Sequence, residues 1–102
     1  MTLNDHRRRI DDLDRELVRL LNRRAQMSIQ LGQIKQETGL PMRDEAREED
    51  IFALVRRYNP GPLDNEALTA IFRLILAESR RITSELLVPA GDHAAESRRQ
   101  SR

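Results

Sequence analysis

Apolar residues recur along the first third of the chain at the spacing of an amphipathic α-helix. Successive members of the pattern are separated by 3, 4, 3, 4, 3, 4 and 3 residues, which is a heptad seam. The seam consists of Ile10, Leu13, Leu17, Leu20, Arg24, Met27, Leu31 and Ile34. The pattern therefore predicts one long helix whose apolar stripe contains an arginine.

Clusters of glycine and proline interrupt the helical pattern, because these residues end helices and turn the chain. The clusters are Gly39-Leu40-Pro41, Asn59-Pro60-Gly61-Pro62 and Pro89-Ala90-Gly91. The predicted helices span about residues 4–38, 45–58 and 64–87. Each is expected to begin at a residue whose short side chain accepts a hydrogen bond from a first-turn backbone N–H, namely Asn4, Asp44 and Asp64.

The end of the chain has no apolar periodicity. We therefore expect a helical domain over residues 1–88 and a polar, disordered tail over 89–102. Few aromatic residues accompany abundant Leu, Arg, Glu and Ala, which favours helix over sheet. The sequence predicts an all-α protein with three helices.

The first predicted helix is too long for its own domain. At about 1.5 Å per residue it measures roughly 50 Å, whereas a compact domain of this size has a radius of gyration of about 13 Å. Two shorter helices cannot cover such a stripe, and the simplest additional cover is a second copy of the chain in a two-fold dimer. We therefore expect an obligate homodimer.

Polar residues occupy apolar positions on all three predicted helices. At 100° per residue, Ser28 and Lys35 lie within about 40° of Arg24, so the first helix directs two cations inward. On the second helix, Arg47 and Glu48 lie one turn before the apolar Ile51, with Asp44 at the helix start. On the third, Ser79 lies on the apolar stripe and Thr83 beside it. A buried charge is costly unless it is paired, hydrated or bound to a ligand of opposite charge.

Each of these residues also has a purely structural interpretation. Arg24 could pair with a glutamate of another helix, Lys35 could extend to water, and Asp44 could be a helix cap. Arg47 and Glu48 could form a surface pair. Together, however, three cations and one or two carboxylates directed at one interior indicate a pocket for a small anion that carries a hydroxyl group.

Composition excludes several kinds of chemistry. The 102 residues include no cysteine and two histidines, which excludes disulfides, thiolate nucleophiles, Cys-based metal sites and a histidine cluster. The 18 Lys and Arg balance 17 Asp and Glu, which gives little reason to bind nucleic acid. No apolar run approaches the roughly 18 residues of a membrane span, and the start lacks a signal core, so we expect a cytoplasmic protein with no membrane association.

Four charged segments of the chain form a specific combination when they are taken in order. They are Arg7-Arg8-Arg9-Ile10-Asp11-Asp12-Leu13-Asp14, Leu20-Leu21-Asn22-Arg23-Arg24, Gly32-Gln33-Ile34-Lys35 and Pro41-Met42-Arg43-Asp44-Glu45-Ala46-Arg47-Glu48. Asn59-Pro60-Gly61-Pro62, Ile71-Phe72-Arg73 and Ser79-Arg80 follow them. In these segments and their order, the chain resembles the all-helical class of chorismate mutases over about residues 3–87. The resemblance implies an intertwined helical dimer that converts chorismate to prephenate for phenylalanine and tyrosine synthesis, without a metal or organic cofactor.

The resemblance also implies roles for individual residues. Arg7 resembles an arginine that reaches the active site of the other subunit, and with Arg24 it would hold the two substrate carboxylates. Lys35 resembles the lysine that contacts the ether oxygen and a carboxylate. Asp44 and Glu48 resemble groups near the ring hydroxyl. Arg47 resembles a further arginine of the site, and Ser79 a serine near the ring carboxylate.

Thr83 departs from the family pattern, which usually has glutamine or glutamate there to share the ether oxygen with the lysine. A threonine hydroxyl reaches less far, and loss of one such donor can lower the rate on the order of a hundredfold. We therefore expect low activity from the free chain, and a complex with the first enzyme of the shikimate pathway is a hypothesis for raising it.

Two alternatives remain open from the sequence. An isochorismate pyruvate lyase would use the same fold, with arginines and a lysine around a dicarboxylate ring, although Asp44, Arg47 and Glu48 favour the mutase. A non-catalytic helical dimer with a regulatory or docking role would use the interior charges for structure alone.

Overall fold

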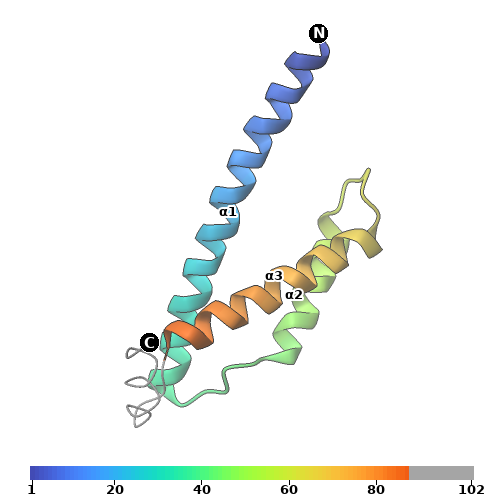
Figure 1. Cartoon of the computed structure of the whole chain (residues 1–102). Coiled ribbons are helices and arrows are strands. Elements are labelled where there is room, and N and C mark those ends of the chain that lie inside the picture. The colour runs from blue at the N-terminus through green and yellow to red at the C-terminus, as the bar shows by residue number, and fades with distance from the viewer. Residues whose placement is uncertain (88–102) are drawn as a thin grey trace.

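The chain folds into three helices. In this computed structural model, which describes residues 1–87, α1 spans Leu3–Thr38, α2 spans Glu45–Tyr58 and α3 spans Asn65–Leu86, with no strand among those residues (Figure 1). The predicted all-α class and the three predicted helices are confirmed. The predicted tail, residues 89–102, lies outside the described residues.

Local side-chain hydrogen bonds define where the helices begin. Asp44 accepts from the backbone N–H of the third helical residue of α2, and Asp64 does the same for α3, as predicted. The prediction of Asn4 as the first cap is wrong. Thr2 caps α1, because its hydroxyl accepts from the Asp5 N–H while the Asp5 carboxylate accepts from the Thr2 N–H, a reciprocal capping box that leaves Asn4 inside the helix.

The third helix joins the other two. It packs against both α1 and α2, whereas α1 and α2 make no close backbone contact with each other within residues 1–87. The amino-terminal half of α1 projects beyond the α2–α3 hairpin (Figure 1). The radius of gyration is 17.9 Å and the longest dimension is 58 Å, so the protomer is far more extended than a compact chain of this length.

The protomer buries little apolar surface. Phe52, Val55 and Leu76 are the buried hydrophobic side chains of the described residues. On the seam of α1, by contrast, Leu13 is 68% exposed and Leu17 is 53% exposed. Within one chain the predicted stripe is therefore an uncovered apolar surface.

A glycine sets the distance between α1 and α3. Gly32 is buried, and a Cβ atom at this position would lie 2.6 Å from Cγ2 of Thr83 and 2.8 Å from Cδ1 of Leu87. Since real Cβ atoms do not approach other atoms so closely, a larger residue would force the Thr83 and Leu87 side chains to move, and the short Thr83 side chain can move only with α3 or by changing its rotamer. Gly32 thus allows the carboxyl-terminal halves of α1 and α3 to pack closely.

This contact predicts the effect of a methyl group at position 32. Gly32→Ala should lower the free energy of unfolding by about 1 kcal/mol or more, because overpacking outweighs the better helix propensity of alanine. Urea unfolding, followed by circular dichroism at fixed protein concentration, measures this change in the free energy of unfolding. Adding Thr83→Ser, which removes Cγ2, should restore part of the lost free energy of unfolding. A Gly32→Ala variant as stable as wild type, or more stable, would contradict the role of Gly32 in this packing.

Candidate functional site

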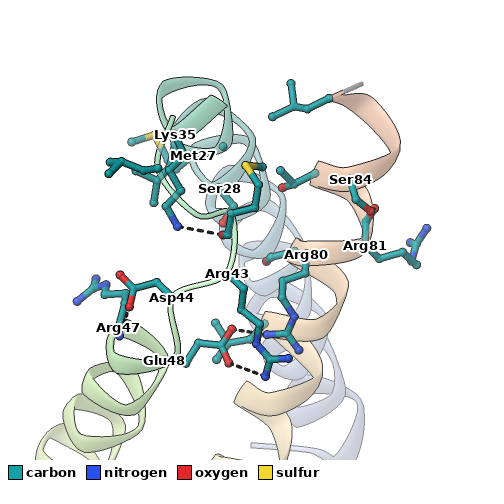
Figure 2. A pocket seen from close by; sticks show the side chains of 18 of the residues that line it. Met27, Ser28, Lys35, Arg43, Asp44, Arg47, Glu48, Arg80, Arg81 and Ser84 are labelled. Atoms are coloured by element: carbon teal, nitrogen blue, oxygen red, sulfur yellow. Dashed lines mark hydrogen bonds and ion pairs between the residues drawn. The ribbon is translucent and has the colours of Figure 1, made fainter. Parts of the chain in front are cut away.

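One large pocket lies where the carboxyl-terminal half of α1, the loop before α2, the first turn of α2 and the carboxyl-terminal half of α3 meet (Figure 2). Its volume is about 1120 Å³. Seven of the eight residues predicted for the site line it, namely Arg24, Lys35, Asp44, Arg47, Glu48, Ser79 and Thr83. Polar residues from the apolar faces of three helices therefore meet in one place, as the sequence pattern indicated.

Arg7 is the exception. It is exposed near the start of α1 and does not line the pocket. With a rise of about 1.5 Å per residue, the backbone of Arg7 lies about 25 Å along the helix from that of Arg24. An arginine side chain cannot span this distance, so Arg7 does not reach the pocket of its own chain.

Arg24 is a half-buried cation on the pocket wall. It donates a hydrogen bond across the α1–α3 contact to the Ser79 hydroxyl at 3.4 Å. Burial lowers the pKa of the Arg24 guanidinium, and the neighbouring positive charge of Arg47 lowers it further. A bound anion would relieve both effects, since it would replace lost hydration and screen the repulsion between the two arginines.

Lys35 lies near the carboxyl end of α1, and its ammonium group donates to the backbone carbonyl of Met42 at 3.2 Å (Figure 2). This bond ties α1 to the loop that leads into α2. An ammonium group carries three donors, so Lys35 can keep this bond and still donate to a ligand.

Asp44 and Arg47 are joined through the helix cap. The Asp44 carboxylate accepts from the Arg47 backbone N–H at 3.0 Å, so the structural interpretation of Asp44 as a cap is correct. The cap uses Oδ1, and it also fixes a carboxylate at the pocket edge. A structural role and a ligand-binding role are therefore compatible at this residue.

Glu48 has two partners outside the eight residues predicted for the site. Its carboxylate is hydrogen-bonded by Arg80 of α3 and forms an ion pair with Arg43 of the loop at 3.6 Å. Arg80 lies one residue beyond the apolar stripe, and Arg43 lies in a loop, so helical periodicity could not find either. One signal in the sequence could have indicated them. Glu48 lies near the apolar face of α2, and a carboxylate in such a place needs a cation from another segment.

Thr83 is 7% exposed, and its methyl group faces Gly32.

Within residues 1–87, no three His, Cys, Asp or Glu side chains are grouped so that they could hold a metal ion. No helix in that part of the chain is long and apolar enough to cross a membrane.

Comparison with known proteins finds similarity along most of the chain. The model of the chorismate mutase type II family matches residues 6–84. Bifunctional chorismate mutase/prephenate dehydratases match over 90 residues, or 84% of this chain: that of Aquifex aeolicus is 34% identical and that of Neisseria gonorrhoeae 38% identical. The chain spans only 25% and 24% of these two relatives, respectively.

A solved structure extends the similarity to the fold. Chorismate mutase (form II) from Thermus thermophilus superposes with a TM-score of 0.77 at 32% sequence identity. The match covers 79% of this chain and 92% of that chain.

The cap at Asp44 gives a test that separates its two roles. Asp44→Ala should lower the free energy of unfolding by about 1 kcal/mol, because the Arg47 N–H loses its acceptor. Asp44→Asn should keep most of that stability, because an amide oxygen also accepts at this position. Thermal unfolding of both variants measures the difference, and equal destabilisation by the two changes would contradict the capping role.

Proposed function

The chain belongs to the chorismate mutase type II family, and on this premise we propose that it catalyses the rearrangement of chorismate to prephenate. The observation that carries the proposal is the convergence of Arg24, Lys35 and Arg47 on one pocket with Asp44 and Glu48. Such a pocket suits a small dianion that carries a hydroxyl group, and chorismate has two carboxylates and a ring hydroxyl.

The two carboxylates require separate cations. We assign one to Arg24, whose guanidinium already bonds Ser79, and the other to Arg7 of the partner subunit. Ser79 lies beside the first carboxylate, and Arg47 adds positive charge. Asp44 and Glu48 accept from the ring hydroxyl.

The chemistry requires positioning and charge rather than a nucleophile. The rearrangement is intramolecular: one C–O bond breaks, one C–C bond forms, and no proton is transferred. Holding the two reacting carbons together in a compact conformer lowers the barrier by several kcal/mol. Negative charge grows on the ether oxygen as the C–O bond lengthens, and the Lys35 ammonium stabilises that charge more in the transition state than in the ground state.

A two-fold, intertwined dimer accounts for two features of the protomer. The seam of α1, including the exposed Leu13 and Leu17, acquires a partner surface. Arg7, which lies about 25 Å along the helix from Arg24, acquires a site to enter. The active site is then shared between subunits.

Thr83 limits the rate of the free chain in this proposal. Its methyl group packs against Gly32, and its short hydroxyl reaches less far into the pocket than a glutamine amide would. Docking to the first enzyme of the shikimate pathway would raise activity if it moved α3 or the loop toward the substrate.

The first test removes the pocket cations. Lys35→Ala and Arg24→Ala should each lower kcat/KM by at least about a hundredfold, because each removes charge that faces the developing oxyanion or a substrate carboxylate. Loss of chorismate absorbance measures turnover, and circular dichroism checks that the helices persist. A folded variant that keeps most of the activity would contradict the assignment.

Subunit mixing tests the shared site. Arg7→Ala and Lys35→Ala homodimers should both be nearly inactive, yet random exchange of subunits should restore about a quarter of the wild-type activity. Half of the dimers are then mixed, and each mixed dimer has one intact site only if Arg7 acts across the interface. Failure to recover activity after demonstrated exchange would contradict that arrangement.

A longer donor at position 83 tests the rate limit. Thr83→Gln should raise kcat/KM of the free chain by about tenfold, because its amide can donate to the ether oxygen. Thr83→Met is the matched control, with similar length and no amide, and should give no gain. Equal effects of the two substitutions would show that size rather than hydrogen bonding matters here.

A further inference from the structure

Glu48 is held by cations from two other segments of the chain. Its side chain is 18% exposed and lies in the first turn of α2. Arg80 approaches it from α3 and Arg43 from the loop before α2, as Figure 2 shows. Such partners stabilise a carboxylate that keeps only a small part of its surface in water.

The two carboxylate oxygens are engaged differently. Oε2 accepts a hydrogen bond from Nη1 of Arg80. Oε1 is 3.6 Å from Nη2 of Arg43, which is ion-pair distance but longer than a hydrogen bond. The Arg80 bond therefore fixes the side chain through one oxygen. The other oxygen keeps acceptor capacity for a ligand in the pocket that Glu48 lines.

Arg80 is the better anchored of the two arginines. It lies on a helix and its side chain is 39% exposed, against 58% for Arg43 on the loop. The neighbouring Arg81 shows the contrast, because its ion pairs are with Glu78 and Glu85 of its own helix. The Arg80 bond, by comparison, links α3 to the first turn of α2 through Glu48.

We propose that Arg80 is a positioning residue: it holds Glu48 through Oε2 so that Oε1 accepts the hydroxyl group of the substrate. This inference rests on the proposed function. An ionised carboxylate only accepts hydrogen bonds, so Glu48 held in this way selects a ring with a hydroxyl donor at this point. It also repels a ligand that places a carboxylate there.

The kinetic signature follows from the reaction. The ring hydroxyl takes no part in the bond changes, so its contact with Glu48 is the same in the ground state and the transition state. Loss of such a contact raises KM and leaves kcat nearly unchanged. A purely structural role would instead lower the fraction of folded enzyme, which lowers apparent kcat at unchanged KM.

The experiment measures chorismate turnover by wild type, Arg80→Ala and Arg80→Lys, with Arg57→Ala as the control. Arg57 stacks over Tyr58 at the other end of α2 and does not line the pocket. We expect KM to rise about tenfold to a hundredfold in Arg80→Ala with kcat within about threefold of wild type. The rise in KM should be smaller in Arg80→Lys than in Arg80→Ala, and Arg57→Ala should have the KM and kcat of wild type.

A double-mutant cycle with Glu48→Gln shows whether Arg80 acts through Glu48. If it does, adding Arg80→Ala to Glu48→Gln should change KM by less than about twofold. Three results would each overturn the positioning role. They are a double variant whose rise in KM is the product of the two single rises, an Arg80→Ala variant in which only kcat falls, and an Arg80→Ala variant with the KM of wild type. Absence of turnover by the wild-type chain would overturn the proposed function and this role with it. An active wild type with any of the three results above would overturn the positioning role alone.

Discussion

The packing of α3 against both other helices is the contact on which the site depends. Within residues 1–87, α1 and α2 are joined through α3 and the connecting loop rather than by direct packing. Gly32 allows α3 to approach α1, and this approach brings Ser79 within reach of Arg24. The bond between Arg80 and Glu48 then ties α3 to the first turn of α2. Without this close crossing, the polar groups of three helices would not face one volume.

The charges of the pocket differ in how far other groups of the chain compensate them. Glu48 is compensated by Arg80 and Arg43. Arg24 is bonded to a neutral hydroxyl and lies near Arg47, so burial and repulsion both disfavour its charged form. An anionic ligand would offset the repulsion between these two arginines.

Local signals in the sequence predicted much of the fold. The caps at Asp44 and Asp64 depend on a few adjacent residues, so they could be predicted, whereas the capping box at Thr2 needed attention to Asp5 three residues later. Polar residues on apolar faces pointed to seven residues of the pocket. Arg80 and Arg43 were missed because their place depends on how the helices cross. The roles assigned to the pocket residues came from the family resemblance, since periodicity shows where a side chain lies and not what it binds.

The central claim is that this pocket promotes an intramolecular rearrangement without proton transfer. The most direct measurement is to incubate chorismate with the purified chain in D₂O and to follow the products by NMR. The account predicts prephenate as the sole product, with no deuterium at its carbon atoms. Release of pyruvate, incorporation of deuterium at carbon during turnover, or chorismate consumed no faster than without protein would contradict it.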